Sequence, residues 1–598
     1  MDYNVLAVNP GHNGSAALVS NGEVVYYLEE ERLTRQKYDG NPFRVINEII
    51  SKYRIDEVVV GGTTSKLPTL PWTGGDPYTE LVKKYYPDVK ISNFGDEHHL
   101  GHAATAFYNS GFKKAVAIVV DGAGSIKRER LDDEGRYEGE GYETESIWVC
   151  EYPNNFAVVR KIHGQNIGTH MDNGRFQFDN SVTVTKAFEA VSHYLGFGFI
   201  EAGKTMGLAP YGEQNPDIPP MFLGNRASKD FFIPNYPAGA FVDQSRLRHV
   251  FDRGPGYNPQ SWHKNPSKLR KIERDLAWKV QQETQKIVGD YIDYAYGSTG
   301  IKDIVICGGY GLNCVANYYF LKRFPDLNIY CEPVAHDGGT AIGIALLAWH
   351  QQNMTDGPNP NTKQTKIYYG PQYSKETIEK VLDTNQDKVT IKQTTAKEIA
   401  QLISEKNIVS VFQGRSEAGP RALGNRSILY DPRDPDGKQF VNTVKGREWF
   451  RPFAGTVLKE EASEWFDMAG LEESPFMMYA VNVAADKISQ IPCVTHVDDT
   501  CRVQTVTAEQ NEHFYNLIKE FYQLTNVPVL FNTSFNLAGD PLVETIEDAL
   551  NTLYRSELKY LYLPELGVLV TKTIDNPERV QELEEEDLSD FTDITFSE

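Results

Sequence analysis

The stretch Ala115-Val-Ala-Ile-Val-Val-Asp121-Gly122 runs through six apolar residues into a carboxylate and a glycine. An apolar run of this length is typical of a buried strand. The same order, strand residues followed by glycine, recurs in Val58-Val-Val-Gly-Gly62 and in Asp303-Ile-Val-Ile-Cys-Gly-Gly309. Such units belong to α/β proteins that hold phosphates or nucleotides in backbone loops. The sequence therefore predicts an α/β fold.

Histidines are concentrated just before this strand, in His98-His99-Leu100-Gly101-His102. His98 and His102 are about one helical turn apart, so they share a helix face, whereas His99 points elsewhere. Two imidazoles at this spacing can bind one metal ion. With carboxylates such as Asp121 and Asp337 they would form a metal site that stays open to substrate. A polar cluster that caps a helix is the alternative interpretation of the pair.

The composition narrows the class of protein. A chain of 598 residues that is 40% apolar is long enough for two or more domains with sizeable cores. Its net charge of −22 argues against indiscriminate binding to nucleic acid or acidic membranes. The sequence shows no C-x-x-C pair, no signal-like start and no apolar run of about 18 residues. We therefore expect a cytoplasmic protein without a membrane span.

A polar stretch rich in Pro and Gly, Gln351–Thr362, indicates a linker. We therefore expect an N-terminal domain at residues 1–365 and a C-terminal domain at residues 366–575. The remaining residues, 576–598, include nine acids and one arginine and are expected to form a solvated tail.

The second domain is rich in cations that stand beside glycines. They occur in Gly414-Arg-Ser-Glu-Ala-Gly-Pro-Arg-Ala-Leu-Gly-Asn-Arg-Ser427 and in Lys445-Gly-Arg-Glu-Trp-Phe-Arg-Pro-Phe453. Arginine forks, lysine charges and free backbone N–H groups bind phosphoryl and carboxylate-like oxygens. Arg421 and Arg426 stand among Gly, Pro, Ala and Leu, which favours anion binding over surface salt bridges. Asn532-Thr-Ser534 ends an apolar strand and could hold a small planar ligand or form a turn.

Eight segments together carry a family resemblance. In chain order they are Gly11–Ser15, His98–His102, Gly203–Gly212, Gly308–Asn313, Asp337–Ala341, Gly419–Ser427, Arg447–Phe453 and Asn532–Asn536. With these segments the sequence, over about residues 1–570, resembles the NodU/CmcH-type O-carbamoyltransferases. Each segment alone is weak evidence, but the eight in this order are specific.

The resemblance implies a fold and a reaction. The N-terminal domain is expected to have the actin/hexokinase-type ATPase (ASKHA) fold, in the version found in tRNA threonylcarbamoylation enzymes. The C-terminal domain is expected to be a YrdC-like α/β domain, which in this family makes carbamoyl adenylate from carbamoyl phosphate and ATP. The N-terminal domain then transfers the carbamoyl group to an acceptor hydroxyl. A divalent metal, usually iron, holds the adenylate there, and Mg²⁺ can accompany ATP.

The resemblance also implies roles for single residues. The metal ligands would be His98, His102, Asp121 and Asp337. The nucleotide would lie near Gly203, Lys204, Gly308, Gly309 and Asn313. Carbamoyl phosphate and the ATP phosphates would be bound by Arg421, Arg426, Ser427, Lys445, Arg447 and Arg451, of which Lys445 and Arg451 are also catalytic candidates. The carbamoyl group would be positioned by Asn532, Thr533 and Ser534.

His12 is the candidate for the base that removes the acceptor proton. An imidazole with a pKa near 6.5 suits proton transfer at neutral pH. A turn histidine that is bonded to the backbone is the alternative. Members of the family often have Asp where this chain has Asn13, which leaves the details of the acceptor side open.

The acceptor itself is not identified by the sequence. Family acceptors are hydroxyls on sugars, antibiotics and lipo-oligosaccharides. The segment Arg246–Arg274 carries eight Lys and Arg residues against two acids, together with three aromatic residues, Phe251, Tyr257 and Trp262. Such groups can grip nucleic acid, so a hydroxymethylpyrimidine in DNA, such as 5-hydroxymethylcytosine, is a second acceptor candidate. A loop and helix cap that balance acidic surroundings form the alternative.

Two other functions would fit the same ATPase-type scaffold. A nucleotide-binding regulatory protein would not need the cations of the second domain. A sugar-kinase-like phosphotransferase would more often use Mg²⁺ with oxygen ligands, which a histidine pair fits poorly. A homodimer is a candidate assembly that the sequence does not decide.

Overall fold

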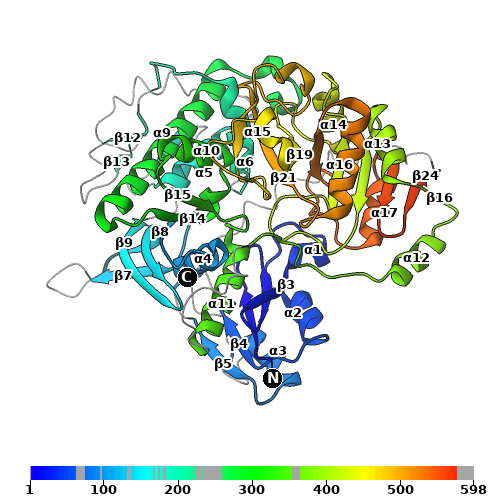
Figure 1. Cartoon of the computed structure of the whole chain (residues 1–598). Helices are drawn as coiled ribbons and strands as arrows, with labels where there is room; N and C mark the ends of the chain where they lie inside the picture. Colours follow the sequence, from blue (N-terminus) through cyan, green and yellow to red (C-terminus); the bar gives the residue numbers. More distant parts are fainter. Residues whose placement is uncertain are drawn as a thin grey trace.

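A computed structural model gives the arrangement of the chain (Figure 1). It describes residues 2–61, 75–94, 97–130, 137–165, 169–172, 175–178, 183–198, 200–218, 220–223, 233–234, 258, 260–352 and 364–574. Within these residues, helices and strands build three larger sheets with helical layers on their faces.

The first sheet has five strands in the order β3-β2-β1-β4-β5. The strands are β1 (Asn4–Asn9), β2 (Ser15–Ser20), β3 (Glu23–Glu29), β4 (Glu57–Val60) and β5 (Lys90–Asn93). The first three are antiparallel neighbours, and β4 and β5 run parallel to β1. Along β1, Val5 and Ala7 belong to one core cluster, whereas Leu6 and Val8 belong to another. Both faces of the sheet are therefore covered, which is why strands β1, β2 and β4 carry apolar residues on both faces.

The second sheet follows the order β15-β14-β6-β8-β7, with β9 paired to β8. Its strands are β6 (Lys114–Val120), β7 (Ile126–Arg130), β8 (Tyr137–Glu151), β9 (Asn155–Gln165), β14 (Asp303–Cys307) and β15 (Asn328–Cys331). Two helices, α4 (His98–Ser110) and α11 (Thr340–Gln352), pack against each other between the two sheets, with α4 on β6 and β14 and α11 on β1 and β2. This packing brings the ends of both sheets to one place.

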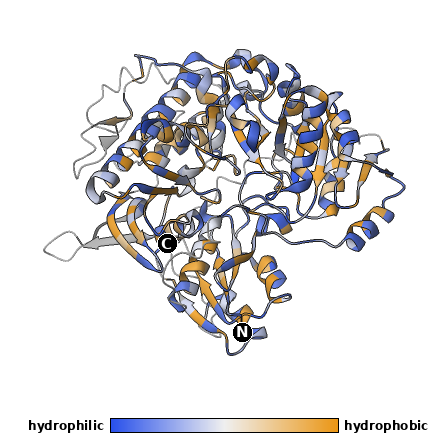
Figure 2. Ribbon diagram, viewed as in Figure 1, coloured by the Kyte–Doolittle hydropathy of each residue, from blue (hydrophilic) through white to orange (hydrophobic). Residues whose placement is uncertain are grey.

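The third sheet has nine strands, in the order β16-β24-β23-β17-β18-β22-β19-β21-β20. They are β16 (Val389–Gln393), β17 (Val409–Phe412), β18 (Arg426–Tyr430), β19 (Ala454–Leu458), β20 (Ala480–Asn482), β21 (Thr500–Val506), β22 (Val529–Ser534), β23 (Tyr560–Leu563) and β24 (Val568–Lys572). Figure 2 shows hydrophobic strands inside and helices with one hydrophilic face outside. That pattern is expected for helices that cover a buried sheet.

The remaining described elements are shorter sheets and helices. Two-stranded sheets join β10 (Thr169–Asp172) to β11 (Arg175–Phe178) and β12 (Phe222–Leu223) to β13 (Ile233–Pro234). The N-terminal helices are α1 (Glu30–Thr34), α2 (Phe43–Ile50), α3 (Pro77–Tyr85), α5 (Val184–Tyr194), α6 (Ala202–Leu208), α8 (Ser261–Lys264), α9 (Lys271–Thr299) and α10 (Cys314–Arg323). The later ones are α12 (Lys375–Asp383), α13 (Ala396–Ser404), α14 (Gly437–Lys445), α15 (Ala462–Trp465), α16 (Glu512–Thr525) and α17 (Ile546–Tyr554).

The α/β fold class predicted from the sequence is confirmed by these sheets. The first two larger sheets use residues up to Cys331, and the nine-stranded sheet begins at Val389. The domain limits at 365 and 575 stay predictions, since residues 353–363 and 575–598 lie outside the described residues. Among the helices of the described part, none has the length and apolar character needed to cross a membrane.

Candidate active site

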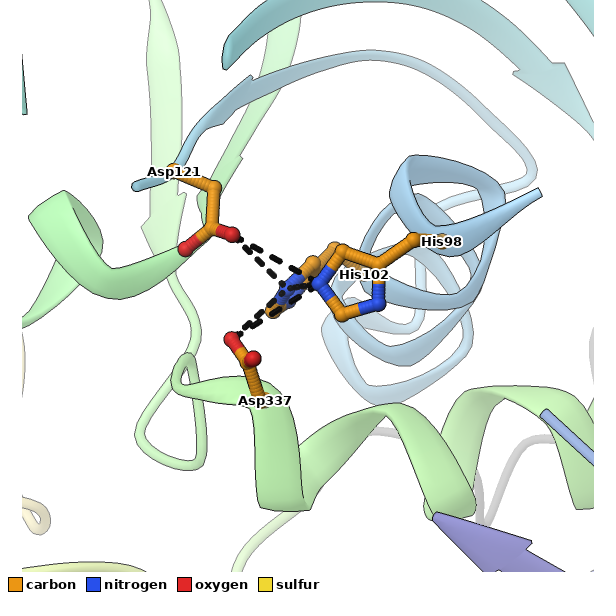
Figure 3. Close-up of side chains that lie close together, drawn as sticks. All are labelled: His98, His102, Asp121 and Asp337. Carbon is orange, nitrogen blue, oxygen red and sulfur yellow. Dashed lines mark hydrogen bonds and ion pairs between the residues drawn. The ribbon is translucent and has the colours of Figure 1, made fainter. Parts of the chain in front are cut away.

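The four candidate metal ligands come together where the first two sheets meet (Figure 3). α4 presents His98 and His102, and Asp121 directly follows β6. Asp337 begins the 3-10 turn η4 (Asp337–Gly339), which leads into α11. α4 and α11 can approach closely because glycine lies at their contact: a Cβ on Gly343 would be 2.3 Å from a backbone oxygen of α4. Small residues at this crossing therefore help to bring the ligands into one cluster.

The geometry of this cluster fits one shared cation. Ligand atoms of the four buried side chains all lie within 4.8 Å of one another. His98 Nε2 is 3.5 Å from Asp121 Oδ2 and 3.7 Å from Asp337 Oδ1. His102 Nε2 is 3.6 Å from Asp337 Oδ1 and 3.0 Å from His98 Nε2. Ligand atoms at about 2.1 Å from one ion are separated by about 3 to 3.5 Å in tetrahedral or octahedral sites.

The charges of the cluster are mutually complementary. Burial lowers the pKa of His98, but Asp337 and Asp121 outweigh it and raise that pKa to about 10. Burial opposes ionisation of both carboxylates, yet the neighbouring histidines keep their pKa values below the usual range. Two imidazole nitrogens with two carboxylates suit a transition metal such as Fe²⁺ or Zn²⁺ better than Mg²⁺ or Ca²⁺. The residues present therefore fit the divalent metal that the sequence predicts.

His12 lies at the edge of the cluster, in the turn between β1 and β2. Its Nε2 is 3.1 Å from Asp337 Oδ2, and 52% of its side chain is exposed. Asp337 raises the pKa of His12 to about 9. His12 therefore contacts a candidate metal ligand on one side and solvent on the other, and in the metal-free protein Asp337 keeps its ring protonated at neutral pH.

The glycine loop after β14 lies directly against His98, His102, Asp121 and Asp337, the four candidate ligands that are together called the metal cluster. Gly308 has φ +81°, and a Cβ there would be 2.4 Å from the carbonyl oxygen of Val120, so only glycine fits. The N–H of Gly309 donates to Asp121 Oδ1 at 2.9 Å. The amide of Asn313 is bonded to Gln281 and caps α10, so backbone groups are what this loop offers to a ligand.

Three partly buried arginines, Arg421, Arg447 and Arg502, form a second group, the arginine cluster. Arg421, Arg447 and Arg502 influence one another electrostatically, and among the described residues no carboxylate lies within 4.0 Å of any of them. Burial and Arg502 lower the pKa of Arg421 to about 9. Burial, Arg451 and Arg502 lower the pKa of Arg447 well below its ordinary value. Buried cations without counter-charges are costly, so this cluster is built to receive an anion.

Some predicted anion ligands are occupied by the protein itself. Arg426 is fully buried, lies over the ring of Phe412 and donates to the carbonyl oxygen of Gln413 at 2.6 Å. Lys445 donates to Ser534 and to the carbonyl oxygen of Asn536. In this structure both cations hold the surrounding turns in shape, and their roles in anion binding and catalysis stay predictions.

The other predicted residues either form hydrogen bonds within the protein or lie at the arginine cluster. Asn532 is fully buried and donates to Thr456 and Gln504, while Ser427 accepts from the N–H of Gly424. Thr533 lies at the arginine cluster, where its hydroxyl accepts from Arg447 Nη1 at 3.2 Å. The side chain of Ser534 accepts a bond from Lys445.

Lys204 and Arg451 lie beside the arginine cluster with acidic partners. Lys204 Nζ is 2.7 Å from both Glu201 and Glu448, and Arg451 is 3.4 Å from Glu448. Gly203, next to Lys204, has open space where a Cβ would stand.

Arg502 and Lys37 are cations of this region that the sequence analysis did not single out. Arg502 stands in β21 among apolar residues, and a cation in an otherwise buried strand was the available signal. Lys37 follows α1, far away in the sequence, and burial and the charge of Arg451 lower its pKa. No local pattern identifies Lys37, because only the packing of the two halves brings it near Arg451.

The basic segment proposed for nucleic acid is only partly described. Trp262 is fully buried against Phe197 and Phe450, so it offers no surface for stacking on a base. Lys271 pairs with Glu213 at 2.6 Å and with Asp275 at 2.8 Å. Phe251, Tyr257 and the residues 246–257 lie outside the described residues. The described part therefore resembles the helix cap that was the alternative interpretation.

Comparison with known families identifies the protein family to which the chain belongs. The family model Carbamoyltransferase N-terminus matches residues 78–346, and the model Carbamoyltransferase C-terminus matches residues 400–572. The chain belongs to the carbamoyltransferase family. It is accordingly an enzyme that transfers carbamoyl groups, as its sequence motifs predicted.

Named relatives cover most of the carbamoyltransferase. It is 31% identical to nodulation protein NolO of Bradyrhizobium diazoefficiens, over 77% of the chain and 76% of that protein. It is 25% identical to a 3′-hydroxymethylcephem-O-carbamoyltransferase of Amycolatopsis lactamdurans, over 91% of the chain and 95% of that enzyme. Among solved structures, HypF of T. kodakarensis aligns with a TM-score of 0.37 and 14% identity, covering 59% of this chain and 48% of HypF.

Proposed function

We propose that this enzyme makes carbamoyl adenylate from carbamoyl phosphate and ATP at its arginine cluster, and then transfers the carbamoyl group to an acceptor hydroxyl beside the metal cluster. One observation carries the proposal: a single turn, η3 (Gly309–Leu312), touches both clusters. At one end the N–H of Gly309 donates to Asp121, and at the other the carbonyl of Leu312 accepts from Arg421 at 3.1 Å. An anion between the arginines therefore lies next to the backbone loop of the metal cluster.

The arginine cluster supplies the binding energy for the first step. Arg421, Arg447 and Arg502 would bind phosphate oxygens, which neutralise cations that the fold leaves without carboxylate partners. Because the donors are fixed before the ligand arrives, they can stabilise the charge that develops in two steps. Water first releases phosphate from carbamoyl phosphate, and the resulting carbamate then displaces pyrophosphate from the α-phosphorus of ATP. Thr533, held by Arg447, adds a hydroxyl at the same place.

The metal cluster is the proposed place of the second step. His98, His102, Asp121 and Asp337 would hold a divalent ion, for which iron is the expected metal. When bound, such an ion supplies Lewis acidity toward phosphate or carbonyl oxygens. The glycine loop lies against this cluster through the bond from Gly309 to Asp121, and its backbone would face the nucleotide part of the adenylate.

His12 would take the proton of the acceptor hydroxyl once a metal ion bound at Asp337 offsets the carboxylate charge that otherwise keeps the ring protonated at neutral pH. Its half-exposed ring can reach an incoming molecule while Asp337 holds its Nε2 edge in place. The hydroxyl oxygen then attacks the carbamoyl carbon, and the bond to AMP breaks. The products are a carbamate ester and AMP.

The acceptor is proposed to be a hydroxyl on a small molecule or a sugar. One relative is named for O-carbamoylation of a 3′-hydroxymethylcephem. Hydroxymethylated DNA is disfavoured, because Trp262 is buried and Lys271 is already paired. A regulatory role and a kinase activity are the remaining alternatives, and neither explains a buried arginine cluster joined to a His–Asp cluster.

Product analysis tests the proposal. The enzyme, loaded with Fe²⁺, is incubated with ATP, carbamoyl phosphate and a panel of hydroxyl compounds that includes hydroxymethylated DNA. We expect AMP, pyrophosphate and an acceptor whose mass has increased by one carbamoyl group. ADP and a phosphorylated acceptor would instead identify a kinase, and nucleotide binding without turnover would support the regulatory alternative.

A further inference from the structure

We infer that Lys186 and Glu189 bind a second hydroxyl of the acceptor, next to the hydroxyl that is carbamoylated. The two residues lie on α5 and are called the α5 pair. The inference rests on the proposed function, in which an acceptor hydroxyl reacts beside the metal cluster. The acceptor is then a compound with hydroxyls on neighbouring carbon atoms.

Two hydrogen bonds hold the first turn of α5 beside the metal cluster. The hydroxyl of Thr185 donates to the carbonyl oxygen of Asp121 at 2.5 Å. The N–H of Val184 donates to Glu145 Oε1 at 3.0 Å, and Glu145 pairs with Val120 at the end of β6. Asp121 follows directly after that strand. The start of α5 is therefore fixed against the turn that carries a candidate metal ligand.

The α5 pair lies over this turn. Lys186 donates to Glu189 Oε2 at 2.7 Å. A Cβ on Gly122, the residue after Asp121, would be 2.9 Å from Glu189 Oε1 and 3.8 Å from Lys186 Nζ. Burial raises the pKa of Glu189, Lys186 opposes this shift, and the charges of Asp121 and His12 also act on the carboxyl group. Glycine at position 122 therefore lets the pair approach the place at which the acceptor hydroxyl would react.

The protein does not use all the hydrogen-bonding groups of the α5 pair. The side chains of Lys186 and Glu189 are mostly buried, with 14% and 22% exposed. Within the part of the chain that the structure describes, Glu189 Oε1 accepts no hydrogen bond, and Lys186 donates only to Glu189. Buried polar groups are normally paired, and leaving them unpaired costs free energy. The pair is therefore prepared to bond a ligand.

Another ion pair, on α9, shows the difference. Lys279 Nζ lies 3.1 Å from Glu283 Oε1, and these side chains are 14% and 17% exposed. There the protein also uses the second carboxylate oxygen, because Glu283 Oε2 accepts from the N–H of Met221 at 2.7 Å. The α5 pair is buried to a similar extent but has no such additional partner among the described residues. The pair on α9 is thus part of the fold, whereas the α5 pair keeps a donor and an acceptor for a ligand.

The charges of the α5 pair select the kind of group that it can bind. A carboxylate only accepts hydrogen bonds, and an ammonium group only donates them. A hydroxyl does both, so one hydroxyl can donate to Glu189 Oε1 and accept from Lys186. A charged ligand would instead compete with one member of the ion pair for the other. Since the reacting group of the proposed acceptor is itself a hydroxyl, a compound with two neighbouring hydroxyls fits both places.

Competition between two small alcohols tests the inference. The enzyme, loaded with Fe²⁺, receives ATP, carbamoyl phosphate and equal concentrations of ethylene glycol and ethanol, and both carbamate esters are measured by mass spectrometry. We expect the natural enzyme to prefer ethylene glycol. In Lys186→Met/Glu189→Met, which removes both charges together, the ratio of hydroxyethyl carbamate to ethyl carbamate should fall about 10-fold, because a hydrogen bond to a charged group is lost. Formation of ethyl carbamate and carbamoyl-phosphate-dependent exchange of pyrophosphate into ATP should not change, since ethanol has no second hydroxyl.

Two further variants separate ligand binding from folding. Gly122→Ala places a Cβ 2.9 Å from Glu189 Oε1, the end of a flexible side chain that can shift, so we expect the ratio to fall while the fold stays intact. Lys279→Met/Glu283→Gln is the matched control and should leave the ratio unchanged, since the glutamine keeps an acceptor for the N–H of Met221. Thermal melting shows whether each variant is folded.

Three results would overturn the inference: no preference for ethylene glycol in the natural enzyme, an unchanged ratio in the folded variants of the α5 pair or Gly122, or an equal loss of both carbamates. AMP formation without carbamoylation of either alcohol also contradicts it, because a site for neighbouring hydroxyls has to accept ethylene glycol. Failure of the proposed function looks different, since the natural enzyme would then form no AMP and pyrophosphate from ATP and carbamoyl phosphate. The two ideas therefore fail with different products.

Discussion

The metal cluster and the arginine cluster are both made of buried charges, but they are balanced in opposite ways. In the metal cluster, two histidines face two aspartates at 3.5 to 3.9 Å. In the arginine cluster, Arg421 and Arg447 are repelled by other cations, and the charge of Glu448 offsets this only in part at Arg447. The first arrangement provides lone pairs for a cation, and the second provides donors for an anion. The charges that surround each cluster thus indicate the sign of the ligand that it can bind.

Removal of a metal ligand should have the largest effect. In His98→Ala we expect carbamoyl transfer to fall by more than about 100-fold, because even outer-shell partners of a ligand contribute 10- to 100-fold. Exchange of pyrophosphate into ATP should continue, since the arginine cluster is untouched. Activity would be measured after loading with Fe²⁺ and with bound metal quantified. Equal loss of both activities would contradict the division of labour between the two clusters.

Removal of an arginine should have the opposite effect, with loss of pyrophosphate exchange and little change in carbamoyl transfer. We expect Arg447→Ala to slow carbamoyl-phosphate-dependent pyrophosphate exchange by roughly 30-fold or more, which corresponds to the loss of a buried charged partner. Transfer from carbamoyl adenylate supplied from outside should change little. Arg44→Ala, a change of an exposed arginine remote from both clusters, serves as control. Normal exchange in Arg447→Ala would remove the arginine from the proposed first step.

Neutralisation of one repelled cation should stabilise the ligand-free protein. In Arg502→Met we expect the free energy of unfolding to rise by about 1 kcal/mol or more, since an apolar residue of similar length relieves an uncompensated buried charge. Pyrophosphate exchange should fall at the same time. Chemical denaturation without phosphate ligands checks the first effect. A less stable variant would show that a counter-charge already compensates Arg502.

The smallest expected effect is a change with pH in the free energy of unfolding. Asp337 raises the folded-state pKa of His12 to about 9, above the ordinary value of 6.5. The His12–Asp337 pair therefore stabilises the metal-free protein fully below about pH 6.5 and loses this contribution as the pH rises through 9. Denaturation of the chelator-treated protein and of His12→Gln at several pH values should show a difference that shrinks over this window. A constant difference would contradict the ion pair.

Much of the site could be predicted from sequence because its residues mark element ends. His98 and His102 have helical spacing, and Asp121 ends an apolar strand. Arg426 shows the limit of such patterns. It stands near glycines, as Arg421 does, but its guanidinium group donates to the carbonyl oxygens of Gln413 and Asn425. Whether an arginine faces a ligand or the backbone depends on rotamers and neighbours that sequence spacing does not contain.

The α/β class, the family segments and the pair of histidines on one helix face could be predicted from the order of the amino acids. These features depend on local periodicity and short-range spacing, which are properties of the chain. Folding is needed to bring Asp337 to His98, to bring Lys37 near Arg451, and to place η3 between the metal cluster and the arginine cluster. Such contacts link residues far apart in the chain, and the packing of helices between sheets creates them.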